Sequence, residues 1–470
     1  MQFKIKEELK NEKIKLAFSG PVLSRSGYGD HARDLVSMLY SMGVFDIKIF
    51  LTDWGMTPST ILENDYKFIE ELIQYGPPEQ SWQPLVHMQL SLPNEFRRSA
   101  AFNIGITAGV ETNITPPKMI EGCNNMDLII VPSTFTKNNI KDSIWRQNHP
   151  QWGEIELNCT KPIEVLPEGI HLHQWGEAKN TSFAKHNLSE MLKDETFAFL
   201  VVGHWINGEP GHDRKDIFST LNVFLLTFNG KENKPCLILK TGLTFSKKEH
   251  VDYIEKIESI KNSVIDNLKE SGINVDLPNI HLLHGDMTRD EMNSLYYHPK
   301  VKSMVSFTKG EAFGRPLLEF SFTGKPIIAS SWSGHMDFLP TSMTPGLLAG
   351  TLQNVHPSVV WQDIIVPEGR WFYVDYRMAS QKMLDVWYNY NAYKQAIIGL
   401  TDHNKSKFSY SATLKQFDEI LVKHLVPFIT GKQTIVPVTN VPKLKKIDDG
   451  ENLQSIEDIL GLNSEENKNG

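Results

Sequence analysis

The chain alternates between short apolar runs and longer segments in which apolar residues recur every three or four positions. Short runs of this kind are typical of buried strands, and the periodic segments are typical of helices. A first series of strands is predicted at 14–19, 46–51, 85–90, 101–107, 127–132 and 163–166. Helices, or the starts of helices, are predicted at 30–42, 120–125 and 134–144.

A second series follows a polar, weakly patterned stretch at residues 171–194, which is the best candidate for a linker. Its strands are predicted at 197–203, 236–241, 280–284, 302–307 and 326–330, and long helices at 376–400 and 409–429. Strands that alternate with helices favour parallel sheets with helices on both faces. We therefore predict an α/β protein with two doubly wound, Rossmann-like domains that face each other across a cleft.

Length and composition agree with this organisation. A chain of 470 residues is too long for one ordinary core, and the predicted domains are 1–175 and 195–400, followed by a closing helix at 401–430. Hydrophobic residues make up 40% and charged residues 22%, as in globular proteins. No apolar run reaches the length of about 18 residues that a membrane helix needs. The charged N-terminal segment, MQFKIKEELKNEK, lacks the apolar core of a signal peptide.

The three cysteines, Cys123, Cys159 and Cys236, are far apart in the sequence and do not have the spacing of metal ligands. This pattern favours a reduced, cytoplasmic protein with idle thiols. The net charge of −8 argues against a general nucleic-acid binder.

The last segment, residues 431–470, is rich in Lys, Asp, Glu, Asn and Gly and is predicted to be disordered. Within it, residues 453–462 can form a short helix with one apolar face. This piece resembles the C-terminal peptides that phage replication proteins insert into a sliding clamp. Docking into the groove of such a partner and packing on the protein's own surface are equally open alternatives.

Residues 301–330 have the pattern of one βαβ unit. An apolar run at 301–307 is followed by a glycine-containing turn, a predicted helix and a second apolar run at 326–330. Glu311 and Glu319, with seven residues between them, flank the start of this helix. In open α/β sheets, ligands lie at the carboxyl ends of the strands, where this turn is expected.

The same turn predicts which ligand is bound. Backbone N–H groups of Ala312, Phe313 and Gly314 at the predicted helix start suit phosphate oxygens, which the helix dipole also favours. Glu319, at least one turn further along, is placed to contact hydroxyls of an attached sugar. Phosphate and sugar in one site indicate a nucleotide-sugar.

This E-x7-E segment, with the strand GKPIIAS after it, resembles the retaining GT-B glycosyltransferases of the large family that includes bacterial mannosyl- and glucosyltransferases. Further segments match in the family order: FSGPVLSRSGYGDHARDL, MDLIIVPSTFTKNNI, IEVLPEGIH, FLVVGHWINGEPGHDRKDIF and NIHLLHGDMTRDEMNSLYYH. The resemblance covers about residues 14–345. It implies the GT-B fold, a nucleotide-diphosphate-sugar donor such as a UDP-sugar, and a last helix that returns to the N-terminal domain.

The resemblance also implies roles for the two glutamates. Glu319 matches the family position that contacts the donor ribose, and Glu311 matches the position that contacts hydroxyls of the transferred sugar. The alternative for Glu319 is a solvated helix glutamate. The alternative for Glu311 is a carboxylate that favours the helix dipole, and this is compatible with the functional role.

Cations are expected to offset the leaving diphosphate. The family places an Arg after the first strand of the second domain, but here His204 follows Gly203, and His204 is a candidate for part of that role. Arg214 and Lys215 stand where the family has a Lys at the next helix start, so Lys215 is predicted to contact the diphosphate. The alternative is an ordinary basic helix start, which the dipole disfavours. Two further candidate cations are Arg315, after the glycine of the turn, and Lys240, at a strand end.

The loop that contains Gly27 and Gly29 has two readings. With Ala32 it matches the dinucleotide fingerprint G-x-G-x-x-A, but residues 20–26 separate it from the strand end that this fingerprint requires. The second reading is the glycine loop of glycosyltransferases, which approaches the donor phosphate and sugar from the opposite domain.

Glu111 is the remaining catalytic candidate. The segment TAGVETN resembles a branch of the family with T-x-x-E-[TS] before a helix that starts with proline, here Pro116 and Pro117. This places Glu111 on the acceptor or sugar side of the cleft. A cap near that helix is the structural alternative.

Together these features predict a retaining glycosyltransferase. Helix dipoles and basic side chains are expected to stabilise the diphosphate, so no metal or other cofactor is required, and no D-x-D metal motif ends a strand. A GT-B-like epimerase or phosphorylase, an NAD-dependent oxidoreductase and a non-catalytic binding protein remain alternatives. The acceptor hydroxyl belongs to a glycan, a lipid, a protein or a hydroxymethylated DNA base.

Overall fold

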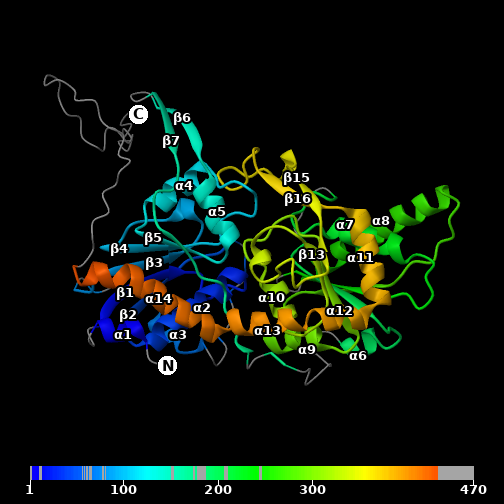
Figure 1. The fold of residues 1–470 in the computed structure, drawn as a ribbon, viewed down its shortest axis with the longest axis horizontal. Helices are drawn as coiled ribbons and strands as arrows, with labels where there is room; N and C mark the ends of the chain where they lie inside the picture. The colour runs from blue at the N-terminus through cyan, green and yellow to red at the C-terminus, as the bar shows by residue number, and fades with distance from the viewer. Residues whose placement is uncertain are drawn as a thin grey trace, which may run out of the picture.

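The computed structural model describes residues 3–431 except 10–12, 56, 58, 60–61, 63–65, 77–78, 80, 150–152, 173–174, 177–186, 206–209 and 243–245. Two α/β domains lie side by side, the first in blue and cyan and the second in green and yellow (Figure 1). Each is built on one six-stranded sheet whose strands are all parallel. The predicted fold of two doubly wound sheets is therefore confirmed.

The first sheet has the strand order β2-β1-β3-β4-β5-β8. Its strands are β1 (Ile14–Gly20), β2 (Phe45–Leu51), β3 (Val86–Leu90), β4 (Phe102–Ile106), β5 (Leu128–Val131) and β8 (Ile163–Val165). Every residue of β3, β4 and β5 is buried, because helices cover both faces of the sheet and exclude water from both sides of these strands.

The described helices of the first domain are α1 (Lys4–Glu8), α2 (Gly27–Met42), α3 (Ile69–Leu72), α4 (Pro117–Asn124) and α5 (Thr134–Asp142), with the 3-10 turn η2 (Pro93–Glu95). Two of them, α2 and α5, begin at serine N-caps. The Ser26 hydroxyl accepts the N–H of Gly29 at the start of α2, and the Ser133 hydroxyl accepts the N–H of Thr136 at the start of α5. An antiparallel hairpin, β6 (Trp145–His149) with β7 (Gly153–Leu157), projects from this domain (Figure 1).

The second sheet has the order β11-β10-β9-β12-β13-β14. Its strands are β9 (Ala198–Val202), β10 (Cys236–Thr241), β11 (Ile280–His284), β12 (Val301–Ser306), β13 (Ile327–Ser330) and β14 (Leu347–Leu348). Its helices are α6 (Leu188–Met191), α7 (Ile217–Phe228), α8 (Lys247–Glu270), α9 (Arg289–Tyr297), α10 (Arg315–Ser321), α11 (Tyr376–Tyr388), α12 (Tyr390–Ala396) and α13 (Ile398–Lys407). The 3-10 turns η4 (Gly334–Asp337) and η5 (Pro357–Val359) and the hairpin of β15 (Gly350–Asn354) and β16 (Arg370–Val374) complete the domain.

The last helix, α14 (Tyr410–Ile429), belongs to the core of the first domain although it follows the second in the chain (Figure 1). Phe417, Leu421 and Leu425 are fully buried in the same cluster as the strands of the first sheet. The Asp418 carboxylate accepts the backbone N–H of Lys4 at 2.8 Å and that of Ile5 at 3.1 Å. The two ends of the described chain are thereby joined.

Several predicted boundaries differ from the structure. The predicted helix at 376–400 is divided into α11, α12 and the start of α13, because the chain leaves helical geometry at Asn389 and Ile397. Helix α2 begins at Gly27 rather than at residue 30, because Ser26 is its N-cap. Among the described residues, no helix is both long and apolar enough to cross a bilayer. The predicted tail helix at 453–462 lies outside the described residues.

Candidate functional site

The candidate site lies where the strand order of the second sheet reverses. β9 and β12 are neighbours, yet the chain continues from β9 to β10 on one side and from β12 to β13 on the other. The loops that follow β9 and β12 therefore diverge and leave a crevice at the carboxyl edge of the sheet. The loop after β1 reaches the same edge from the first domain, since Arg25 Nη1 lies 2.6 Å from Asp286 Oδ2, which follows β11.

A cavity of about 320 Å³ opens between the domains at this edge. Loops of both domains line it, and its wall is rich in charged side chains. The first domain contributes Arg25, Ser26, Gly27, Asp30, Arg33, Leu62 and Tyr66. The rest of the lining is formed by Trp175, Lys240, Gly242, Asp286, Met287, Thr288, Arg289, Met292, Arg315 and Glu319.

Glu311 forms the centre of a buried charge cluster after β12. Its carboxylate accepts hydrogen bonds from Lys215 Nζ and, at 2.8 Å, from Thr308 Oγ1, while Arg214 Nη1 lies 3.3 Å from its second oxygen. The backbone N–H of Glu311 donates to Ser333 Oγ at 2.9 Å and fixes the loop. Burial would raise the pKa of Glu311, but Lys215 and Arg214 outweigh it and lower the pKa to about 2. The carboxylate is therefore ionised at neutral pH and able to accept hydrogen bonds from hydroxyls.

Arg214 and Lys215 do not begin a helix, contrary to the prediction. Asp216 follows them with a φ of 52°, and α7 starts only at the next residue. This left-handed turn is held by the buried side chain of Lys309, whose Nζ lies 3.4 Å from Asp216 Oδ1, and by the Tyr376 hydroxyl, which donates to Asp216 Oδ2 at 2.6 Å. The turn directs both cations into the cluster. Lys309 and Asp216 are both buried, so removing either one would leave the charge of the other unpaired in the core.

Glu111 joins this cluster from the first domain. Its Oε1 lies 3.2 Å from Arg214 Nη2, so Arg214 bridges Glu111 and Glu311 across the cleft. The alternative role as a helix cap does not hold, because the N-cap of α4 is Pro116. The predicted candidates Glu111, Arg214, Lys215 and Glu311 are thus brought together in one place.

Glu319 lies in a second cluster, on α10, where Arg315 is shared by three carboxylates. Arg315 Nε donates to Glu319 Oε1 at 3.1 Å, and its Nη1 lies 3.1 Å from Asp34 Oδ2 and 3.4 Å from Glu168 Oε2. Burial raises the pKa of Glu319 and that of Glu168 to about 7 each, although Arg315 acts in the opposite direction. Burial also acts to raise the pKa of Asp34, but Arg315 and His171 outweigh it and lower that pKa.

The helix start predicted at Ala312–Gly314 is wrong by a few residues. Gly314 is the N-cap of α10, with a φ of 94°, so Ala312 and Phe313 precede the helix. The Phe313 ring is buried in the core, with its centroid 5.2 Å from that of Phe338. Any contact that Phe313 makes with a donor therefore comes from its backbone.

Of the remaining predicted site residues, Gly27 and Lys240 line the cavity, whereas Gly29 and His204 do not. Gly27 lines the cavity, whereas Gly29 packs so closely that a Cβ there would lie 2.0 Å from Ser24 O. Lys240 also lines the cavity and donates to Gly285 O at 2.7 Å, and burial lowers its pKa to about 8. His204 is exposed after β9 and is not part of the cavity lining.

The structure adds functional candidates that the sequence did not reveal. Asp34 and Glu168 complete the Arg315 cluster, and Arg289 lines the cavity with its guanidinium 5.7 Å from the Tyr66 ring centroid. A signal existed for Glu168, which is the variable residue of the segment VLPEGI. Asp34 lies inside an amphipathic helix pattern, and nothing in that pattern distinguishes it from a surface carboxylate.

Neither the known protein families nor the curated protein sequences match this chain. Solved structures do. Sucrose-phosphate synthase from Thermosynechococcus elongatus is 12% identical, with a TM-score of 0.55, over 90% of this chain and 100% of that one. A Rickettsia africae glycosyltransferase is 13% identical, with a TM-score of 0.55, over 88% and 99% of the two chains.

HepE of Anabaena, in a complex with UDP and glucose, is 10% identical, with a TM-score of 0.53, over 87% of this chain and 100% of that one. These structural neighbours are GT-B glycosyltransferases. The two facing parallel-sheet domains of this chain have the same architecture, so the protein has the GT-B fold.

Proposed function

We propose that the protein is a retaining glycosyltransferase that moves a sugar from a nucleotide-diphosphate sugar to an acceptor hydroxyl. The observation that carries this proposal is the convergence of Lys215, Arg214 and Glu311 at the point where the second sheet reverses its strand order. The loop that holds Glu311 continues into Arg315 and Glu319, which line the interdomain cavity. One loop therefore connects the charge cluster at Glu311 with the wall of the cavity.

In this proposal, different side chains bind different parts of the donor. Glu319 accepts hydrogen bonds from the ribose hydroxyls, and Glu311 accepts them from hydroxyls of the transferred sugar. Lys215 and Arg214 offset the negative charge that grows on the departing diphosphate, and they are already held in place before the reaction. Lys240 and the backbone near Gly27 border the same cavity and serve the diphosphate from its other side.

Retention requires departure and attack on one face of the sugar. The acceptor hydroxyl attacks the anomeric carbon as the bond to the diphosphate breaks, and a leaving phosphate oxygen takes the hydroxyl proton. Glu311 is engaged by two cations and Thr308, which suits an acceptor of hydrogen bonds better than a nucleophile. Glu111, which contacts Arg214 from the first domain, is assigned to the acceptor side in this proposal.

The comparisons support a uridine donor, since HepE has a similar fold and was crystallised with UDP and glucose. The dinucleotide alternative has less support. Residues 21–26 separate the end of β1 from the start of α2, whereas the NAD fingerprint needs its first glycine directly at the strand end.

Thermal unfolding in the presence of UDP, GDP, ADP and NAD⁺ tests the donor class. One nucleoside diphosphate should raise the midpoint, because a ligand that binds only the folded state stabilises it. With the matching nucleotide-sugar, NMR of the transferred sugar should show the anomeric configuration of the donor. An inverted product would contradict retention, and stabilisation by NAD⁺ alone would contradict the proposed class.

A further inference from the structure

A second group of chemically reactive side chains lies far from the cleft, at the amino ends of β9, β10 and β11. Glu195 precedes β9, Cys236 is the first residue of β10, and His281 is the second residue of β11. Cys236 and Ile238 point to the same face of the sheet, and Ile238 is opposite His281 in the parallel register. The register therefore brings the thiol and the imidazole to one face, where the carboxylate of Glu195 joins them.

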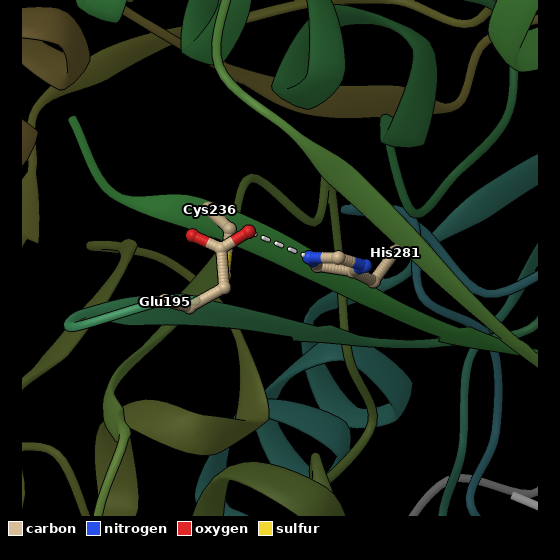
Figure 2. A group of neighbouring side chains, drawn as sticks. All are labelled: Glu195, Cys236 and His281. Carbon is tan, nitrogen blue, oxygen red and sulfur yellow. Dashed lines mark hydrogen bonds and ion pairs between the residues drawn. The ribbon is translucent and has the colours of Figure 1, made fainter. Parts of the chain in front are cut away.

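Figure 2 shows the Glu195 carboxylate turned toward the His281 ring, with Cys236 beside it. Glu195 Oε1 lies 2.9 Å from His281 Nε2, and one potential ligand atom from each of the three residues lies within 4.8 Å of the others. Cys236 is fully buried and Glu195 is 8% exposed, whereas the His281 side chain is 21% exposed. The three potential metal ligands are therefore largely buried, and the partly exposed His281 ring is their contact with solvent.

We propose that Glu195, Cys236 and His281 bind a divalent transition-metal ion of the zinc type. Carboxylate oxygen, thiolate sulfur and imidazole nitrogen are the three ligand types that zinc takes in proteins. Bonds of about 2.0–2.3 Å in tetrahedral geometry hold ligand atoms roughly 3.3–3.8 Å apart, so the three donors need only small rotations to surround an ion. Water would complete the four ligands.

No Lys or Arg side chain of the described residues competes with a metal ion for the Glu195 carboxylate. Buried carboxylates are normally paired with a cation or bound to a metal. Among the described residues Glu195 has no ion pair with Lys or Arg, and the nearby ammonium of Lys300 instead donates to the carbonyls of Leu192 at 2.6 Å and Lys193 at 2.9 Å. Within the cluster Glu195 pairs with the His281 ring, and an ion bound between the three donors would replace that contact.

The surroundings also supply an orienting contact. Asn279 Nδ2 donates to Glu195 Oε1 at 2.9 Å and fixes the carboxylate, as outer contacts do in known metal sites. Burial raises the pKa of the Cys236 thiol, and the hydrogen bond to Glu195 raises it further. Binding therefore exchanges one proton for the ion: the S–H bond breaks, the thiolate coordinates the metal, and the proton leaves to solvent.

Titration of chelator-treated, full-length protein with Co²⁺ tests the proposal without using transferase activity. The wild type should bind one Co²⁺ per chain and show the thiolate-to-cobalt charge-transfer band of the near ultraviolet, which Zn²⁺ then removes by displacement. Cys236→Ser should abolish the band. Asn279→Ala should weaken binding about ten- to a hundred-fold, because it leaves the ligands intact but removes the contact that orients Glu195.

Cys159→Ser is the matched control, because this partly exposed thiol lies in the other domain. The charge-transfer band should persist in this variant. If Cys236→Ser does not fold by circular dichroism, His281→Gln serves instead and should weaken Co²⁺ binding at least as much as Asn279→Ala. A wild type without a saturable band overturns the proposal and leaves a hydrogen-bonded cluster. The same holds if the band survives in Cys236→Ser or is lost in Cys159→Ser.

Discussion

Arg214 Nη2 lies 3.2 Å from Glu111 Oε1, and this ion pair joins the two domains across the proposed reaction site. Arg214 also contacts Glu311, so its charge is shared between two carboxylates. Lys215 pairs with Glu311 alone among the carboxylates of the cluster. The two adjacent cations therefore differ in their partners: Arg214 contacts carboxylates of both domains, whereas Lys215 contacts only Glu311.

Lys215→Ala should slow transfer by about 10²–10³-fold, the usual effect of removing one group that stabilises developing charge. Single-turnover kinetics measure this step, and acceptor binding should change much less. Lys234→Ala is the control. It removes an ammonium that lies just before β10 and pairs with Asp276, and it should leave the rate unchanged. If Lys215→Ala transferred the sugar at the wild-type rate and Arg214→Ala were inactive, Arg214 rather than Lys215 would be the residue that stabilises the leaving diphosphate.

The affinity for the donor should fall both at acidic pH and at alkaline pH. The pKa of Glu319 is raised to about 7, so below this pH the carboxyl is protonated, loses its charge and binds the ribose more weakly. The pKa of Lys240 is lowered to about 8, so above this pH its positive charge is lost and the diphosphate binds more weakly. Affinity should therefore be greatest between these values.

Calorimetry across this pH range measures the profile. Glu319→Gln should remove the acidic limb and Lys240→Arg the alkaline limb. Glu168→Gln measures what the second raised carboxyl of the Arg315 cluster contributes to the acidic limb, because Glu168 has a similarly raised pKa and the same Arg315 partner. A profile that is the same in Glu319→Gln and the wild type would refute the role of this carboxylate.

Chelation should leave the rate of transfer at moderate temperature unchanged if, as proposed, side-chain cations rather than a metal offset the diphosphate charge. Any ion held by Glu195, Cys236 and His281 lies at the opposite, amino edge of the sheet, so its removal should lower the midpoint of thermal unfolding instead. A strict requirement of transfer for Mn²⁺ or Mg²⁺ would show that a metal binds with the donor.

Much of the fold was predictable because the central strands of both sheets are buried and read as apolar runs. The prediction at 163–166 differs from β8 by one residue, and 236–241 agrees with β10. The breaks at Asn389, between α11 and α12, and at Ile397, between α12 and α13, were not predictable, since both residues are compatible with a continuous helix. The hairpin of β6 and β7 was also missed, because its strands are short, largely polar and outside the main sheet.

The site was predictable where its residues lie in segments that resemble known motifs, and most directly where they follow one another along one loop. Glu311, Arg315 and Glu319 share one segment, so the motif located them. Asp34 reaches Arg315 from a helix of the other domain, and a contact of this kind depends on how the two domains face each other. The ligands of the proposed metal site are likewise far apart in the chain, and only the strand register brings Cys236 to His281.

The tail beyond Gly431 carries the prediction of a docking segment at 453–462, which lies outside the described residues. Truncation after Gly431 should leave transfer to a small free acceptor unchanged, because α14 already completes the core of the first domain. It should reduce transfer only to a large acceptor delivered by a partner, such as replicating DNA on a sliding clamp. Loss of thermal stability and of all activity would instead place the segment within the fold.

The most direct test of the account is the calorimetric affinity of the nucleotide-sugar donor for the wild type and for Glu319→Ala. Loss of hydrogen bonds to a charged carboxylate costs about 1.5–3 kcal/mol, so the donor should bind about ten- to a hundred-fold more weakly. Glu258→Ala, which removes an exposed carboxylate on α8, should bind the donor as the wild type does. Equal donor affinity in the wild type and a folded Glu319→Ala protein would contradict the assignment of this cleft as the donor site.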